Sequence, residues 1–308
     1  MFFFIQNALN DNNMAHFMNK IYTRTLGIHS LQFGDHLLQG RHLNIRKRCL
    51  AFGAGPWVLK VAPQYPNVTF HGIHTLPIVH NLDPTTVITE VDDLNLDLQH
   101  LHGRYDAVHC RDAAIGVVHL PRFIGECINA LTPGGVFEFE DIDPHLYHPG
   151  GHVFLADTTS LLIDTAPSWT VPSPPPTMHY FVRLLAARSF ALQLHGTDTG
   201  AISRVGTWLV SHPDVEIVNE VETFVNIQDP SSRDVFMVGF VPLICFDMLT
   251  EFLKRIIGTA VIQLRLCGTP ETVIEELKGG AVQEVLDSRL PVLLRFIRVT
   301  ARKNRSRY

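Results

Sequence analysis

The stretch RCLAFGAGPWVLKVAPQYPNVTFHGIHTLP, Arg48 to Pro77, decides the fold. An apolar run leads into a glycine turn at 53–55, a helix-like run follows, and a second β-branched run ends at His74. A glycine turn between strand and helix lets the backbone approach a ligand closely and points helix N–H groups at it. The second run ends about twenty residues after the turn, as in doubly wound folds that bind nucleotide cofactors.

The alternation of short apolar runs with helical patterns continues along the chain. It predicts an α/β fold: a doubly wound, mostly parallel seven-stranded sheet, with its ligand crevice at the carboxyl ends of the strands. The predicted strands are 48–53, 68–74, 86–91, 105–110, 135–140, 215–227 and 290–301. The predicted helices beyond the first half are 178–195, 201–211, 244–266 and 271–288.

The domain organisation follows from the same pattern. We expect an N-terminal helical cap at 1–44, a single α/β domain at 45–303 and a basic tail at 304–308. The domain carries a helical insertion at about 150–212. Within it the Pro-rich stretch 166–177 is expected to be a surface loop or lid.

Composition limits the partners. The 308-residue chain has a net charge of -5, which gives no reason to expect electrostatic binding to nucleic acid. Its five cysteines form no CxxC pair, which favours a reducing, cytoplasmic location, with the nucleus open to a regulatory protein. The chain contains no run of eighteen apolar residues, so its sequence predicts no membrane span. A small molecule is the expected ligand, and a protein partner is expected if the chain is regulatory.

Polar side chains follow several of the predicted strands. His74 ends the second, Asp92 and Asp93 follow the third, and Arg111 follows the fourth. Because the carboxyl ends of parallel strands share one edge of a sheet, these groups should converge on one crevice.

The order of motifs FGAG, HGIHTLPI, EVDDLN, YDAVHCRDAAIG and LTPGGVFEFEDID resembles that of class I S-adenosylmethionine-dependent methyltransferases, in particular the fungal LaeA-like branch of secondary metabolism. The likeness runs from about residue 20 to 303. It implies S-adenosylmethionine as cofactor and a small-molecule acceptor. It also assigns roles: Gly53 and Gly55 pass under the methionine moiety, Asp92 and Asp93 bind the adenine edge, Arg111 lies beside the amino-acid end, and residues 140–143 face the substrate.

Three positions depart from the family pattern. Ala51 stands where the first strand carries an acidic residue, Trp57 where the third glycine belongs, and His74 where a carboxylate grips both ribose hydroxyls. Imidazole can make one of those hydrogen bonds but not the pair. Each lost hydrogen bond to a charged group costs roughly 1.5–3 kcal/mol of binding free energy.

The chain holds 17 histidines, several of them in DIDPHLYHPGGH, residues 141–152. This segment lacks the regular spacing of a metal site, and we expect no metal. A histidine titrates near neutral pH, so we assign general acid–base work to His145 or His148, together with Asp141. His109, inside the fourth strand, is expected to be a core histidine.

Two functions stay open at this point. The first is an active methyltransferase on a small molecule in fungal secondary metabolism. The second is a methyltransferase-like protein without methyl transfer, acting as a regulatory or binding subunit or as a recruited cyclase or isomerase.

Overall fold

The computed structural model describes residues 12–42, 46–52, 55–74, 86–114, 117–147, 179–194, 196–226, 246–287 and 293–305. They fall into two compact units. The sheet unit comprises Phe2–Ile142, Ala201–Thr223 and Phe296–Tyr308, and the helical unit comprises Asp143–Gly200 and Phe224–Arg295. The predicted domain boundaries stay a prediction, and the Pro-rich stretch 166–177 lies outside the described residues.

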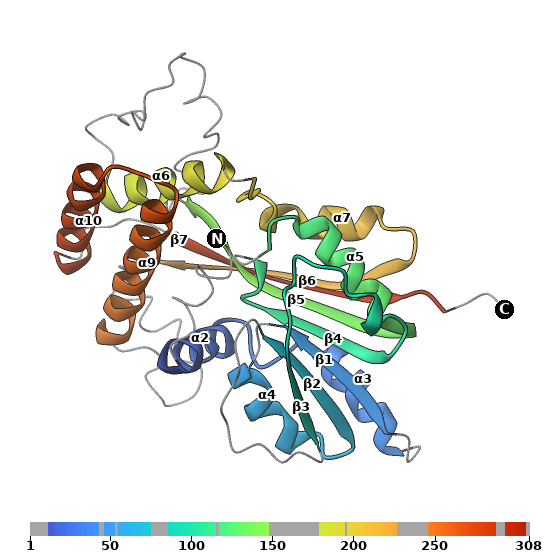
Figure 1. The fold of residues 1–308 in the computed structure, drawn as a ribbon. Helices are drawn as coiled ribbons and strands as arrows, with labels where there is room; N and C mark the ends of the chain where they lie inside the picture. Colours follow the sequence, from blue (N-terminus) through green and yellow to red (C-terminus); the bar gives the residue numbers. More distant parts are fainter. Residues whose placement is uncertain are drawn as a thin grey trace. The chain divides into compact units, whose positions relative to one another are not determined.

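A seven-stranded sheet with the order β3-β2-β1-β4-β5-β7-β6 confirms the predicted fold (Figure 1). The pairs β3–β2, β2–β1, β1–β4 and β4–β5 are parallel. Chain order reverses between β1 and β4, which is the switch point where doubly wound folds bind ligands. The strand bounds are β1 Lys47–Phe52, β2 Val68–His74, β3 Val87–Val91, β4 Tyr105–Arg111, β5 Leu131–Tyr147, β6 Val215–Asn226 and β7 Leu293–Lys303.

The fifth strand begins earlier than predicted. Residues 132–135, at the start of the predicted strand, form an irregularity inside β5, because Tyr105 pairs with Leu131 while Ala107 pairs with Val136. Gly134 has φ +81°, a conformation that favours glycine. The last strand of the chain also lies between β5 and β6 rather than at the edge.

The strands bury alternate residues on two faces. One face joins Leu50, Val108 and Phe137 to α5 (Leu120–Ala130) and α7 (Val205–Ser211) in an apolar core. The other face carries Cys49, Ala51 and Phe70, with side chains from α3 (Leu31–His42) and α4 (Gly55–Val61). A parallel sheet needs both faces covered, and this alternation supplies it. The α2 helix (Asn12–Thr25) precedes α3, and short 3-10 turns span Ala62–Gln64, Gln99–Leu101 and Ile202–Arg204.

Three helices make up the described core of the helical unit: α6 (Tyr180–Leu194), α9 (Phe246–Leu266) and α10 (Glu271–Leu286). Glu284 of α10 accepts hydrogen bonds from the N–H groups of Tyr180 and Phe181 at 2.8 and 2.9 Å. These first N–H groups of α6 have no partner within the helix, so Glu284 supplies their acceptors. A Cβ at Gly280 would lie 2.2 Å from the Tyr180 ring, so this glycine is what lets α10 approach α6.

Candidate cofactor and acid–base site

The predicted cofactor residues of the second and third strands meet at one edge of the sheet. The N–H of Asp92 donates to the carbonyl of His74 at 3.0 Å, just beyond the pairing of β2 with β3. Asp92 accepts the Asp93 N–H at 2.8 Å, and Asp93 accepts both the N–H and the side-chain amide of Asn95. The two carboxylates are therefore held at fixed positions.

Of the glycine turn, Gly55 is described and is the buried first residue of α4, whereas Gly53 lies outside the described residues. The cofactor roles assigned to Gly53, Gly55, His74, Asp92, Asp93 and Arg111 stay predictions.

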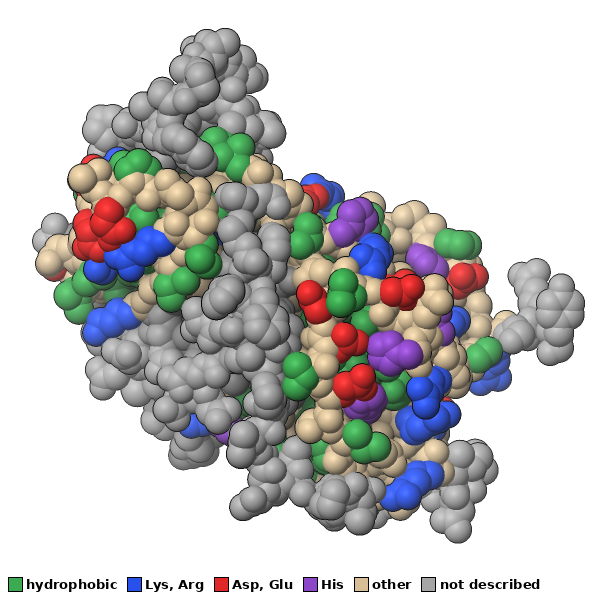
Figure 2. All heavy atoms as spheres, viewed as in Figure 1, with side chains coloured by type: hydrophobic (Ala, Val, Ile, Leu, Met, Phe, Trp, Pro, Cys, Tyr) green, Lys and Arg blue, Asp and Glu red, His purple; other side chains and the backbone are tan. Residues whose placement is uncertain are grey.

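Three residues at this edge of the sheet carry side chains that could bind a metal ion. Glu90, Asp92 and His100 each offer one ligand atom, and these atoms lie within 4.8 Å of one another. On the face seen in Figure 2, histidine and acidic side chains lie side by side. Nε2 of His100 is 3.6 Å from a carboxylate oxygen of each partner.

Trp57 turns into the core of the sheet unit. Its side chain is completely buried, and its ring lies parallel to that of His109, with 3.7 Å between centroids and 10° between planes. Nε1 of Trp57 donates to the carbonyl of Ile28 at 2.6 Å. The rings of Phe33 and Phe70 meet the indole edge-on, each at 6.2 Å. The third-glycine position therefore holds a packed core residue.

Ala51 lies within the same core. It pairs in register with His109 and belongs to the cluster that contains Trp57. Since side chains of paired residues in a parallel sheet share a face, the stacked rings occupy the face onto which a side chain at 51 would extend. The missing carboxylate and the added indole are thus structurally linked.

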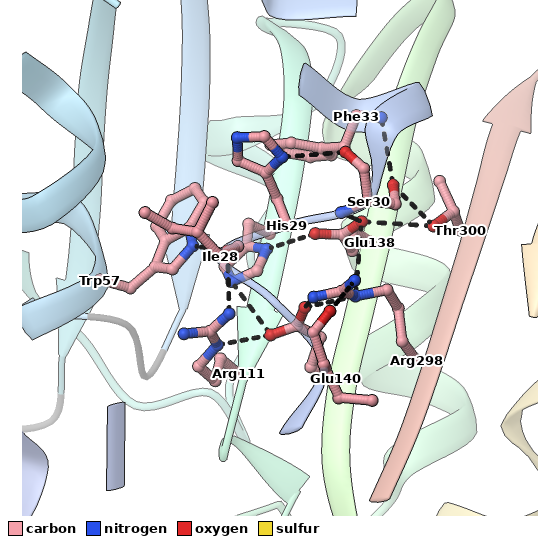
Figure 3. A network of polar contacts seen from close by, with 12 residues as sticks. Ile28, His29, Ser30, Phe33, Trp57, Arg111, Glu138, Glu140, Arg298 and Thr300 are labelled. Atoms are coloured by element: carbon pink, nitrogen blue, oxygen red, sulfur yellow. Dashed lines mark hydrogen bonds and ion pairs between the residues drawn. The ribbon is translucent and has the colours of Figure 1, made fainter. Parts of the chain in front are cut away.

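A buried network of charged residues lies on the same face (Figure 3). Glu140 of β5 accepts from Nε of Arg111 at 2.5 Å and from Nε of Arg298 at 2.6 Å. Glu138 accepts the N–H of Ser30 at 2.8 Å. Two carboxylates thus balance two guanidinium groups.

His109, near Glu138, is completely buried, as expected of a core histidine, and burial lowers its pKa. Burial opposes ionisation of Glu138, but the hydrogen bond with His109 and the charge of Arg298 lower the pKa of Glu138 to about 2. Nδ1 of His109 is 3.4 Å from Oε1 of Glu138. Glu138 is therefore ionised at neutral pH.

The network holds the segment that follows α2. Arg298 donates to the carbonyls of Leu26 (2.5 Å) and Gly27 (3.0 Å), and Arg111 donates to that of Ile28 (2.9 Å). Cations at a helix C-terminus are favourable because the last carbonyls lack helical partners. Three side chains donate hydrogen bonds to the carbonyls of residues 26–28, and we call them the latch: Arg111, Arg298 and Trp57.

Arg111 donates through all three of its nitrogens to protein acceptors, including Asn19 at 2.7 Å. Arg111 lies at the end of β4, as predicted. Its side chain binds Glu140 of β5 and Asn19 of α2.

A second polar cluster lies at the ends of β4 and β5. The Tyr22 hydroxyl is 3.4 Å from Oδ1 of Asp112 and 3.5 Å from Oδ1 of Asp141. Asp141 also accepts the N–H groups of Ala114 (3.0 Å) and Ile142 (2.8 Å). Burial, together with the nearby Asp112 charge, raises the pKa of Asp141 well above its usual range. Such a carboxyl is suited to acid–base work.

The helical unit holds the other predicted acid–base residues. Nδ1 of His145 lies 2.6 Å from Oδ1 of Asp143, while the other oxygen of Asp143 accepts from Tyr147 (2.8 Å) and Arg295 (3.0 Å). Burial opposes ionisation of Asp143, but the hydrogen bond with His145 outweighs burial and lowers the pKa of Asp143. This carboxylate orients the imidazole. His148 lies outside the described residues, and the catalytic roles of Asp141, His145 and His148 stay predictions.

Sequence reasoning missed three residues of these clusters: Tyr22, Asp112 and Arg298. Asp112 directly follows Arg111 in the quoted motif, and Arg298 interrupts an apolar strand, which is an unusual place for a cation. Tyr22 carries no comparable signal in the sequence.

The chain matches two curated proteins from fungi. It is 27% identical over 268 residues to the secondary metabolism regulator laeA of Coprinopsis cinerea, which covers 84% of this chain and 60% of that protein. It is 32% identical over 100 residues to the methyltransferase pytC of Aspergillus terreus, covering 32% of this chain and 31% of that protein. The chain thus spans less than two thirds of the length of either relative. No family model matches it.

Solved structures show a weaker likeness. The plantazolicin methyltransferase BpumL, in complex with SAH, gives a TM-score of 0.42 at 14% identity over 98% of this chain and 94% of that one. The [4+2]-cyclase SpnF gives 0.43 at 13% identity over 89% and 82%. Among the described residues, no helix is long and apolar enough to cross a membrane. The chain is thus similar to laeA over 268 residues, and its seven-stranded sheet has a doubly wound strand order.

Proposed function

We propose that the protein is an S-adenosylmethionine-dependent methyltransferase that acts on a small molecule, as a tailoring step of fungal secondary metabolism. The observation that carries the proposal is the fixed arrangement of His74, Asp92 and Asp93 at the adjoining ends of β2 and β3, on the β1 side of the switch point. A decayed site would not be expected to keep both carboxylates anchored in this way.

The described residues fit the adenosine half of this cofactor. Asp92 and Asp93 offer acceptors for the adenine edge, and His74 offers one hydrogen bond to a ribose hydroxyl. At the methionine end, β1 supplies no carboxylate, because Ala51 stands there in the core beside Trp57. We therefore expect weak binding, sustained by the adenosine half and by the backbone of the glycine turn.

The cofactor, when bound, supplies an activated methyl group whose bond to sulfur breaks with its electron pair remaining on sulfur. The chain then has two tasks: to orient the acceptor in line with that methyl group and to take up the acceptor's proton. The carboxyls of Asp112 and Asp141, at the ends of β4 and β5, are placed for the second task.

Calorimetric titration of the full chain with S-adenosylhomocysteine tests the proposal. We expect a saturable heat, with affinity weakened by about tenfold or more in Asp92→Asn, since a hydrogen bond to a charged group contributes roughly 1.5–3 kcal/mol. Asp35→Asn, at an exposed position of α3, is the matched control and should bind like the wild type. Absence of heat at millimolar ligand, or equal loss in both variants, would contradict the proposal.

A second function is favoured by the stacked Trp57 and His109 rings, which fill the face above Ala51. A protein that no longer transfers methyl would tolerate this filling and act as a regulatory subunit, in line with the name of the laeA relative. That function requires a protein partner, and affinity capture with the full chain as bait that recovers none would count against it. We place the methyltransferase in the cytoplasm and the regulator in the cytoplasm or nucleus, in both cases without nucleic-acid binding.

A further inference from the structure

We propose that Asp112 and Asp141 share one proton through Tyr22, and that Asp112 is the group that takes up the acceptor's proton during methyl transfer. This inference rests on the proposed function for its reaction, but the proton-sharing cluster can be tested without cofactor or acceptor.

The geometry of the cluster carries the first step. One buried hydroxyl stands within 3.5 Å of a carboxylate oxygen of both aspartates. A hydroxyl has a single hydrogen, so it can donate to only one of them at a time. Two carboxylates that converge on one buried hydroxyl repel each other when both are ionised, and the favourable state holds one proton between them.

The surroundings favour that state. Asp141 has 3% of its surface exposed, and its oxygens already accept two backbone N–H groups. The other charged groups that face Tyr22 are Arg111, 5.5 Å over its ring, and Glu140, which is ion-paired with Arg111. The charge of Arg111 is thus already balanced by Glu140, so it does little to offset the repulsion between the two aspartates.

Asp112 is the member that an acceptor reaches. It is only partly buried, whereas Tyr22 and Asp141 are buried. Its φ of +54° makes it the one described non-glycine residue with positive φ. Strained backbone of this kind persists where surrounding structure enforces it and is concentrated at functional sites. Here it places a carboxylate directly after β4, at the predicted ligand edge.

The latch positions Tyr22. The carbonyl of Tyr22 accepts the N–H of Leu26, and the carbonyls of Leu26, Gly27 and Ile28 are held by Arg298, Arg111 and Trp57. The end of α2 is thus fixed to β4 and β7 one helical turn beyond the hydroxyl. Trp57, the departure at the third-glycine position, acquires a positioning role in this arrangement.

The proton transfer balances. A lone pair on the acceptor's oxygen or nitrogen would form the new bond to the methyl carbon, while the bond from that carbon to sulfur would break with its pair left on sulfur. The electron pair of the acceptor's O–H or N–H bond would stay on the acceptor atom, and the proton would go to a carboxylate oxygen of Asp112. The pair then holds two protons and releases one to solvent before the next cycle.

Carbon-13 NMR of the full chain, labelled at the aspartate carboxyls and titrated between pH 4 and 9, tests the inference. Asp112→Asn and Asp141→Asn assign the two signals. We expect coupled titration, with one step well above the ordinary aspartate value of about 3.9. Tyr22→Phe keeps the ring and removes the donor, so it should move that step further upward. Tyr105→Phe, whose hydroxyl lies 2.6 Å from His71 at the far end of β4, should leave it unchanged.

Independent titration of both aspartates near their ordinary value, or equal effects of Tyr22→Phe and Tyr105→Phe, would overturn the inference. The S-adenosylhomocysteine titration separates the two proposals. Ligand heat with ordinary carboxyl titration would contradict only the proton-sharing cluster. Elevated carboxyl titration without ligand heat would contradict only the methyltransferase.

Discussion

The indole of Trp57 lies flat on the imidazole of His109, with ring centroids 3.7 Å apart and an interplanar angle of 10°. Both side chains are completely buried. His109 pairs in register with Ala51, so the stack accounts for a small residue at 51 and a large one at 57 as one packing arrangement. Two of the three departures from the family pattern therefore have a common structural cause.

The first prediction concerns the size of Trp57. Trp57→Ala should lower the free energy of unfolding by about 3–5 kcal/mol, because it leaves a cavity in a closely packed core. Urea denaturation monitored by circular dichroism measures it. Trp208→Ala, at a partly buried position of α7, is the control and should cost clearly less. Equal losses would mean that the stack with His109 contributes nothing particular.

The second prediction concerns restoring the family's acidic residue. Ala51→Asp should destabilise the protein and fail to tighten S-adenosylhomocysteine, because position 51 has no exposed surface and faces the aromatic stack. Thermal unfolding and calorimetry give the two readouts, with Ala51→Val as the apolar control for added volume. Tighter ligand binding at unchanged stability would show that the face above β1 is open to the cofactor.

The third prediction concerns the buried ion pairs of the latch. Arg298→Met should cost about 3–5 kcal/mol of unfolding free energy, because it removes one partner of Glu140 and the donor to the Leu26 carbonyl, and leaves the Gly27 carbonyl with only the 3.4 Å contact from Arg111. Arg265→Met removes an exposed ion pair with Glu271 and serves as the control, for which we expect a far smaller effect. Similar losses in the two variants would contradict the importance of burial.

The fourth prediction concerns His36 of α3. Burial, with the nearby charge of Lys47 second, lowers the pKa of His36 to about 4. The unfolded chain binds this proton below about pH 6.5, so stability is lost as pH falls from 6.5 to 4, by about 3 kcal/mol in total. His36→Gln should remove this part of the pH dependence, whereas His16→Gln, at an exposed position, should keep it. Urea titrations at several pH values decide between them.

The fifth prediction concerns Asp141, whose pKa is raised in the folded state by burial first and by Asp112 second. The folded state then holds a proton that the unfolded chain has released, so the stability from this carboxyl is present at low pH and is lost as pH rises through the raised value. Asp141→Asn mimics the protonated form. Its melting temperature relative to wild type should increase with pH, and a difference independent of pH would contradict the assignment.

Much of the fold could be read from local pattern. The runs predicted at 68–74 and 105–110 form β2 and β4 almost residue for residue, since β-branched runs between turns strongly favour strands. The prediction was poorer at β5, where Thr132 to Gly135 form an irregularity within the strand, because pairing with β4 resumes beyond the glycines.

The candidate site divides in the same way. The sequence by itself determined the sheet and the position of His74, Asp92 and Asp93 at strand ends, because these follow from periodicity and spacing along the chain. The three departures at 51, 57 and 74 follow from the resemblance to the methyltransferase pattern. Only the tertiary structure decided that Trp57 packs on His109 and that Tyr22 meets Asp112 and Asp141. Those contacts join residues 52 to 119 positions apart, and such pairings depend on how α2 and the sheet pack rather than on any local preference.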